Sequence, residues 1–260
     1  MNKIGVINHI TEWLKRYSDE SGTKGFVVGV SGGIDSALTS TLAARTGKPT
    51  LCLEMPIHQA ESQITRASEH IDFLQKEFPN VTRQELDLSA VFDGFVAALP
   101  PSGAASRDMA LVNTRARLRM TTLYYFAQLN GSIVVGTGNK VEDFGVGFYT
   151  KYGDGGVDIS PIADLMKSEV YALAKELNVI QSILDAAPTD GLWGDDRTDE
   201  DQIGASYPEL EWAMDFIANG EVGEVSSRQE KVLEIYKRLN RINQHKMIPI
   251  PVCLIPETLK

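Results

Sequence analysis

The most restrictive feature of this sequence is an apolar run that stops abruptly at small residues and is followed by a helical pattern. Residues 26–30 read FVVGV, residues 31–33 read SGG, and residues 35–46 carry small and apolar residues at helical spacing. A second apolar run at 50–54 is again followed by a helical pattern, which extends to Leu74. Continuous apolar strands that alternate with helices are typical of parallel sheets covered on both faces. The sequence therefore predicts an α/β fold with a doubly wound, mainly parallel sheet.

Later segments continue this pattern. Strand candidates cover 81–88 and, with a stronger apolar signal, 132–136. The glycine-rich stretch 145–161 is too polar and too broken for a core element, and a loop of this length is more often functional. No repeat or low-complexity linker is present, so we expect residues 1–260 to form a single domain with a helical C-terminal region. Helical spacing of apolar residues predicts helices over 1–20, 108–129, 167–178 and 206–240.

Composition and charge narrow the classes of function. The chain has 25 Lys and Arg against 35 Asp and Glu, a formal net charge of −10, which argues against a nucleic-acid partner because such proteins show a clustered basic excess. Cys52 and Cys253 are isolated and form neither a zinc motif nor a disulfide framework. The N-terminus lacks the continuous apolar stretch of a signal peptide, and no window is long enough to cross a membrane. We therefore expect a cytoplasmic protein without a membrane partner.

The sharpest chemical signal lies between the first strand and the first following helix. Glycines at such a junction let backbone N–H groups close on an anion, and the positive end of the helix dipole favours phosphate. Serine hydroxyls can donate further hydrogen bonds, and Asp35 can hold Mg²⁺ against the polyphosphate charge. The motif lacks the lysine of a Walker loop and the spacing of GxGxxG, and the bland alternative is a plain glycine-rich turn. The candidate ATP-binding residues of this loop are Gly29, Val30, Ser31, Gly32, Gly33, Ile34, Asp35 and Ser36.

Residues 31–36, SGGIDS, resemble the signature of the N-type ATP pyrophosphatases. Three further runs resemble the ammonia-dependent NAD synthetases in order and spacing, and the likeness covers nearly the whole chain. They are NTRARLRM at 113–120, GTGNKVE at 136–142 and FYTKYGDGG at 148–156. This resemblance implies an adenine nucleotide alpha hydrolase-like fold and a carbon–nitrogen ligase that completes NAD biosynthesis. It also implies a homodimer.

The implied reaction joins ammonia to the nicotinate carboxylate of deamido-NAD. The carboxylate would attack the α-phosphorus of ATP, with Mg²⁺ present, to release pyrophosphate and form NAD-adenylate. Ammonia would then attack the activated carbonyl and expel AMP. The glutamine-dependent branch carries an additional amidase domain, for which 260 residues leave no room, so free ammonia or a separate protein is expected to supply the nitrogen.

The resemblance also implies roles for individual residues. The catalytic residues would be Asp35, Lys167 and Asp158, with Asp35 and Glu142 as Mg²⁺ ligands. Besides the 29–36 loop, the residues that contact ATP would be Thr137, Lys167 and Thr189. The residues that contact deamido-NAD would be Arg117, Lys151, Asp158, His245 and Lys246. Two departures are visible: many members have GTDHAAE in place of GTGNKVE, and the loop from 148 is shifted by one residue relative to some members.

Other readings stay open at this point. The same ATP chemistry could serve another acceptor, as in GMP synthesis, argininosuccinate formation or tRNA thiolation, although the paired cysteines common in thiolation are missing. A nucleotide-sensing module that binds ATP without turnover is the non-enzymatic alternative. Arg115 and Arg119 are expected to form ion pairs on a solvated or subunit-contact face. The acidic run Asp195, Asp196, Asp199, Glu200 and Asp201 is expected to be a solvated loop with helix-start carboxylates, and Trp193 is expected to be partly exposed.

Overall fold

The centre of the molecule is a four-stranded parallel sheet with the order β3-β2-β1-β4. The structure, a computed structural model, describes residues 1–189 and 198–260. In the register of the sheet, Phe26 pairs with Thr50 on one side and with Ile133 on the other. This confirms the predicted doubly wound sheet. The strands are β1 (Phe26–Gly29), β2 (Thr50–Glu54), β3 (Val81–Glu85) and β4 (Ile133–Val134).

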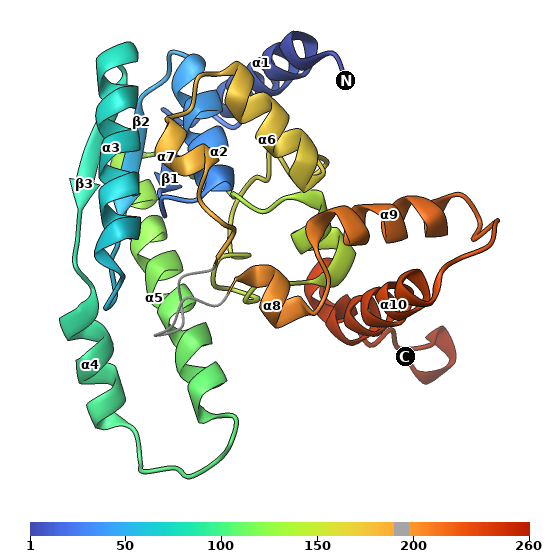
Figure 1. Ribbon diagram of the computed structural model, residues 1–260. Helices are drawn as coiled ribbons and strands as arrows, with labels where there is room; N and C mark the ends of the chain where they lie inside the picture. Colours follow the sequence, from blue (N-terminus) through green and yellow to red (C-terminus); the bar gives the residue numbers. More distant parts are fainter. Residues whose placement is uncertain (190–197) are drawn as a thin grey trace.

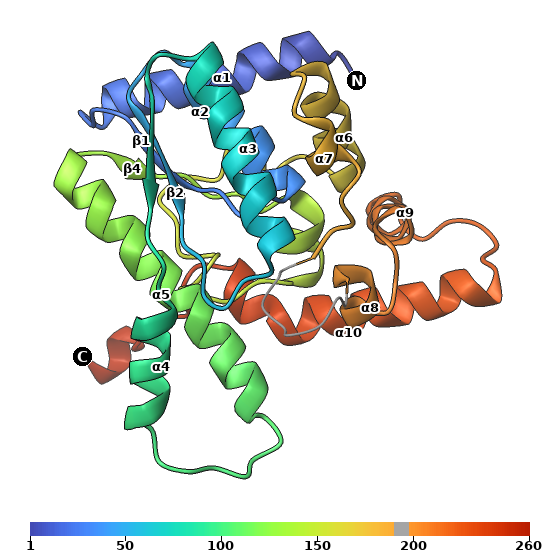
Figure 2. The same ribbon diagram turned by 60° about the vertical axis from the view of Figure 1, so that its left-hand side comes forward.

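Helices cover both faces of this sheet because successive strand residues point to opposite sides. Phe26 and Val28 pack in one core with residues of α1, α2 and α6, whereas Val27 and Leu53 pack in another with residues of α4 and α5. Figures 1 and 2 show α4 and the first half of α5 extending beyond the sheet. The helices around the sheet are α1 (Lys3–Glu20), α2 (Ile34–Arg45), α3 (Glu61–Glu77), α4 (Ser89–Ala98), α5 (Arg107–Asn130), α6 (Lys167–Glu176) and α7 (Gln181–Leu184).

The C-terminal helices form their own hydrophobic cluster beside the sheet (Figure 1). They pack against a short π-helix, η1 (Val141–Val146), whose Val141 and Val146 are fully buried. The expectation of one continuous helix over 206–240 is wrong. The chain turns at Gly220, which has a φ of +84°, and a new helix begins after the N-cap Ser226. The C-terminal elements are α8 (Asp199–Ile203), α9 (Tyr207–Ala218), α10 (Ser227–Met247) and η2 (Glu257–Leu259).

The loop after β1 is held in a conformation that its sequence requires. Gly32 has a φ of +80°, and a Cβ on it would lie 2.5 Å from the backbone oxygen of Gln63 in α3. Both facts exclude a larger residue, because side chains disfavour positive φ and this neighbour is backbone. The close contact with α3 fixes the loop at the carboxyl edge of the sheet, where open α/β folds bind their ligands. Among the described residues, no helix is both long and apolar enough to cross a membrane.

A buried histidine joins α3 to the helix that follows this loop. Nε2 of His70 lies 3.0 Å from the hydroxyl of Ser40, which donates a 2.7 Å hydrogen bond to the backbone oxygen of Ser36. The ring is fully buried, and this burial lowers the pKa of His70 to about 4. His70 is therefore neutral in the folded protein at neutral pH.

This neutral state makes stability depend on pH. The folded pKa of His70 lies below the unfolded value of about 6.5. The contribution of His70 to stability is therefore fully present above pH 6.5 and is lost as the pH falls from 6.5 to about 4. We expect this residue to remove up to about 3 kcal/mol of unfolding free energy over that range. Urea unfolding at several pH values measures this contribution in the wild type and in His70→Gln. His9→Gln, on the exposed face of α1, is the control. An identical pH dependence in all three proteins would contradict it.

Candidate active site

A cavity opens at the carboxyl edge of the sheet, between the 29–36 loop, the start of α3 and the middle of α5. Every residue predicted to contact ATP or Mg²⁺ lines it, although these residues come from five separate segments of the chain. They are Gly29, Val30, Ser31, Gly32, Gly33, Ile34, Asp35, Ser36, Thr137, Glu142, Lys167 and Thr189. The sheet thus collects at one edge the residues that the motifs single out.

Hydroxyl groups shape the 29–36 loop from within. The backbone N–H of Gly33 donates to Oγ of Ser31 at 3.2 Å, and the Ser31 and Ser36 hydroxyls lie 3.2 Å apart. Oγ of Ser36 donates to the backbone oxygen of Gly33 at 2.9 Å. The loop leads directly into the N-terminus of α2, where free N–H groups and the helix dipole favour an anion. The arrangement can therefore bind phosphate.

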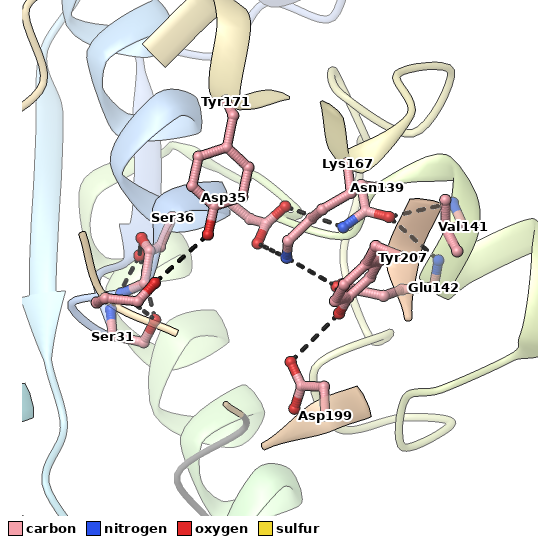
Figure 3. Close-up of polar contacts among 12 residues, drawn as sticks. Ser31, Asp35, Ser36, Asn139, Val141, Glu142, Lys167, Tyr171, Asp199 and Tyr207 are labelled. Atoms are coloured by element: carbon pink, nitrogen blue, oxygen red, sulfur yellow. Dashed lines mark hydrogen bonds and ion pairs between the residues drawn. The ribbon is translucent and has the colours of Figure 1, made fainter. Parts of the chain in front are cut away.

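The strongest electrostatic feature of the cavity is a buried lysine between two carboxylates (Figure 3). Nζ of Lys167 lies 2.6 Å from Oδ2 of Asp35 and 3.0 Å from Oε1 of Glu142, and the lysine is only 3% exposed. Burial alone would lower the pKa of Lys167, but Asp35 and Glu142 outweigh it and raise that pKa above its ordinary value. The lysine is therefore a fixed positive charge.

The two carboxylates are also held by an amide side chain. The amide nitrogen of Asn139 donates to Oδ1 of Asp35 at 3.0 Å. Its oxygen accepts hydrogen bonds from the backbone N–H groups of Val141 and Glu142, both at 3.1 Å, at the start of η1. Asn139 is fully buried, so it fixes the phosphate-loop aspartate and the helix that carries Glu142 relative to each other.

The pKa values of the two carboxyl groups are shifted in opposite directions. Burial raises the pKa of Asp35, and the neighbouring Glu142 charge adds to this effect against the opposing Lys167. Burial also opposes the ionisation of Glu142, but Lys167 and the hydroxyl of Tyr207 outweigh it and lower the pKa of this carboxyl group.

The donor set fits Mg²⁺. Carboxylate oxygens are the ligands that this ion prefers, and it is usually held by one or two carboxylates together with water and substrate phosphates. Nζ of Lys167 occupies the space between Oδ2 of Asp35 and Oε1 of Glu142, so the remaining lone pairs of these two carboxylates would hold the ion. Within 1–189 and 198–260, no group of three or more His, Cys, Asp or Glu residues is arranged to hold a metal ion. An ion at this place would therefore need the phosphates of a nucleotide as further ligands.

Asp143 and Asp154 also line the cavity, and sequence reasoning missed both of them. Burial and the charges of Glu142, Asp154 and Asp35 raise the pKa of Asp143 to about 8. Burial likewise raises the pKa of Asp154. A Cβ at Gly138 would lie 2.2 Å from Oδ1 of Asp143, so this glycine makes room for the carboxyl group. Gly138 stands where the sequence GTDHAAE has an aspartate, so this departure from the common motif goes together with the position of the Asp143 side chain.

None of the five residues predicted to contact deamido-NAD lines the cavity, and four of them, all except Asp158, form a second group. Nη2 of Arg117 donates to the backbone oxygen of Lys151 at 3.3 Å, and Nζ of Lys151 donates to the backbone oxygen of His245. Nζ of Lys246 donates to the backbone oxygens of Gly147 and Tyr149 at 2.8 and 2.7 Å. Three cations thus meet where α5, the 148–156 loop and the end of α10 come together. Among the described residues, these side chains donate their hydrogen bonds to neutral backbone carbonyl groups, which leaves their positive charge available to an anion.

Asp158, a predicted catalytic residue, lies elsewhere. Its Oδ1 accepts a 2.9 Å hydrogen bond from the hydroxyl of Tyr124, and its Oδ2 accepts one of 2.8 Å from the backbone N–H of Val134. The carboxylate therefore ties α5 to the end of β4, and Asp158 is not among the residues that line the cavity. Its catalytic role stays a prediction.

The expectation that Arg119 lies on a solvated face is wrong. Arg119 is partly buried and lines the cavity, where Nε donates to the backbone oxygen of Met55 at 2.9 Å and Nη2 donates to Gln59 at 2.7 Å. Arg115 is also partly buried, with its guanidinium 4.7 Å from the ring centre of Phe92. The sequence gives no signal for either position, because both depend on which side of α5 faces the sheet.

The acidic run is only partly as expected. Asp199, Glu200 and Asp201 do begin a helix, with Thr198 as its N-cap. Asp199, however, is buried and lines the cavity, so it is not a solvated carboxylate. Trp193, Asp195 and Asp196 lie outside the described residues.

Comparison with known proteins agrees with this geometry. Residues 6–249 match a family model described as NAD synthase. The NH(3)-dependent NAD(+) synthetase of Methanosarcina mazei is 38% identical over 253 residues, which cover 94% of this chain and 96% of the relative. A solved NMN synthetase from Francisella tularensis has a TM-score of 0.83 and 33% identity, with 99% of each chain covered. An NH3-dependent NAD synthetase from Campylobacter jejuni, solved with nitrate, has a TM-score of 0.79 and 26% identity over 98% of this chain and 100% of that one.

Gly138→Ala tests the packing of Asp143 against this backbone. The added Cβ would lie 2.2 to 2.4 Å from atoms of the Asp143 carboxyl group. We expect the unfolding free energy to fall by about 1–3 kcal/mol, as in other overpacked sites. Asp143→Ala in the same protein removes the obstructing atoms and should recover most of this loss. Urea unfolding of both single variants, the double variant and the wild type gives the coupling energy. Strictly additive losses would show that the two residues do not touch.

Proposed function

This chain belongs to the NAD synthase family and amidates deamido-NAD to NAD with consumption of ATP, and we propose that the cavity at the carboxyl edge of the sheet is its active site. The observation that carries this proposal is the Lys167 ammonium between Asp35 and Glu142, directly beside the 29–36 loop. Phosphate-binding N–H groups, a buried cation and two carboxylates for Mg²⁺ are the groups that cleavage of ATP between its α and β phosphates requires.

In this proposal the 29–36 loop binds the phosphates of ATP through its backbone N–H groups and the hydroxyls of Ser31 and Ser36. Thr137, Lys167 and Thr189 complete the nucleotide site. Bound Mg²⁺ would neutralise charge on the polyphosphate, with Asp35 and Glu142 as its protein ligands. Lys167 adds a positive charge that the protein holds in place before the reaction begins, so it stabilises charge that develops on the departing pyrophosphate.

The deamido-NAD carboxylate attacks the α-phosphorus and pyrophosphate leaves, which forms NAD-adenylate. Ammonia then attacks the nicotinoyl carbonyl, and AMP leaves. Neither step needs a covalent bond to the protein, so catalysis rests on position and charge. Arg117, Lys151, His245 and Lys246 would bind the dinucleotide acid, because the arginine and the two lysines place positive charge close to the 148–156 loop, where they donate to backbone carbonyl groups.

Three further proposals concern the whole chain. We propose that residues 1–260 act as one domain, since the C-terminal helices pack on η1, the element that carries Glu142. The homodimer and the cytoplasmic location are also proposals. They are in keeping with the family resemblance and with the absence of a membrane-spanning helix among the described residues. Light scattering of the purified protein would test the dimer.

The main experiment is a turnover assay with deamido-NAD, ATP, Mg²⁺ and either ammonium or glutamine. NAD, AMP and pyrophosphate should form with ammonium; ADP as the product would refute adenylation. One solved relative is described as an NMN synthetase, so the assay should be repeated with nicotinic acid mononucleotide in place of deamido-NAD. ATP binding without any turnover would instead favour the nucleotide-sensing alternative.

Asp35→Asn tests the phosphate and metal site while it preserves the shape of the side chain. We expect kcat to fall at least about 100-fold, as when one charge-stabilising group is removed elsewhere. The change leaves the hydrogen bond from Asn139 possible, so the fold should survive, which circular dichroism would check. Lys167→Ala is less suitable, because it removes the cation that both partly buried carboxylates share and should itself lower stability. Full activity of Asp35→Asn would remove this residue from the mechanism.

Arg117→Ala tests the second cluster separately. We expect KM for deamido-NAD to rise, with the affinity for ATP largely unchanged, because Arg117 contacts Lys151 and does not line the cavity. Steady-state kinetics with each substrate varied in turn would measure both effects. The reverse pattern, with weaker ATP binding only, would be incompatible with the assignment.

A further inference from the structure

Tyr207 reaches the candidate active site from the C-terminal helices, and no motif pointed to it. It is 4% exposed, and its hydroxyl lies 2.5 Å from Oε1 of Glu142 and 3.2 Å from Oδ2 of Asp199 (Figure 3). Nζ of Lys167 lies 4.7 Å from the centre of its ring. One side chain therefore contacts both the lysine and one of the two carboxylates that surround it.

The backbone of Tyr207 is itself firmly placed. It begins α9, whose N-cap Ser206 accepts a hydrogen bond from the N–H of Glu209. The N–H of Tyr207 donates to Oε1 of Glu200 in α8 at 2.8 Å. A phenol attached to such a fixed point holds its hydrogen-bond partner in one orientation, which is what a metal ligand requires of its supporting groups.

Core packing does not account for the hydroxyl. The ring belongs to the hydrophobic cluster that includes Leu210 and Val232, and a phenylalanine would fill that space equally well. The oxygen instead lies within the group of charged side chains. A buried hydroxyl without a hydrogen-bond partner is destabilising. The hydrogen bond to Oε1 of Glu142 therefore compensates for the burial of this hydroxyl.

We propose that Tyr207 is a positioning residue for Glu142: its hydroxyl holds Oε1 and its ring supports the Lys167 ammonium, so that Oε2 of Glu142 is presented to a divalent cation. This inference rests on the proposed function, because that function makes Glu142 a ligand of Mg²⁺. It also links the C-terminal helices to the phosphate site, since Tyr207 is part of their hydrophobic cluster.

The test compares Tyr207→Phe with Tyr236→Phe. Tyr236 is buried in the same cluster, but its hydroxyl forms no hydrogen bond within the described part of the chain, so it controls for removal of a phenol oxygen from this cluster. Mn²⁺ binding is measured by electron paramagnetic resonance in the presence of α,β-methylene-ATP, which does not require turnover. We expect Tyr207→Phe to bind Mn²⁺ about 10–100-fold more weakly than the wild type, as for other groups that orient a metal ligand. Tyr236→Phe should bind it normally.

Binding of α,β-methylene-ATP with EDTA present and thermal unfolding separate this role from a structural one. Tyr207→Phe should keep its metal-free nucleotide affinity within about 2-fold of the wild type. Unchanged Mn²⁺ affinity, or equal losses of Mn²⁺ and metal-free nucleotide binding, would overturn the positioning role. If the wild type itself bound no Mn²⁺ with the nucleotide analogue, the proposed function would fail and the inference with it; normal wild-type binding together with an unaffected Tyr207→Phe would overturn the inference alone.

Discussion

The structure depends on one buried ammonium group. Lys167 at the start of α6 lies between Asp35 at the start of α2 and Glu142 in η1, three segments that are far apart in the sequence. Burial of a charge is unfavourable unless its partners are close and well oriented, and removal of one partner leaves an uncompensated charge inside the protein. The ammonium group therefore requires the sheet edge, the π-helix and α6 to be in their places together. In return, it provides a positive charge beside the phosphate loop without the need for substrate to organise it.

Neighbouring side chains make this arrangement rigid. Asn139 bonds to Asp35 and to the backbone that carries Glu142, while Tyr207 approaches the same carboxylate from the C-terminal helices. Asn139 follows the last strand of the sheet and Tyr207 belongs to the C-terminal helices. The positions of Asp35 and Glu142 therefore depend on both parts of the chain. This explains how a C-terminal cluster with its own hydrophobic core takes part in a site at the edge of the sheet.

The elements that depend on local sequence patterns were predicted closely. The β1–loop–α2 unit, the strand at 50–54 and the long helix over 108–129 are found within one or two residues of their predicted bounds, because apolar runs and helical spacing fix them. The helix α4 and the break after Ala218 were missed: α4 has few buried residues to reveal it, and a break depends on a turn at Gly220. Asp35 and Glu142 lie in recognisable motifs, whereas the roles of Asn139, Asp143 and Tyr207 arise only from contacts made in three dimensions.

The spatial separation of the two groups of site residues has a mechanical consequence. One segment serves both groups: Glu142 stands at its start, Tyr149 and Asp154 line the cavity, and Lys151 belongs to the cation cluster. Lys246 binds the backbone oxygen of Tyr149, so the end of α10 is attached to the wall of the cavity itself. A dinucleotide acid held by the cations is thus bound beside the segment that lines the ATP site. In the proposed function, the segment that binds the acid through Lys151 therefore also forms part of the wall of the cavity in which the acid reacts.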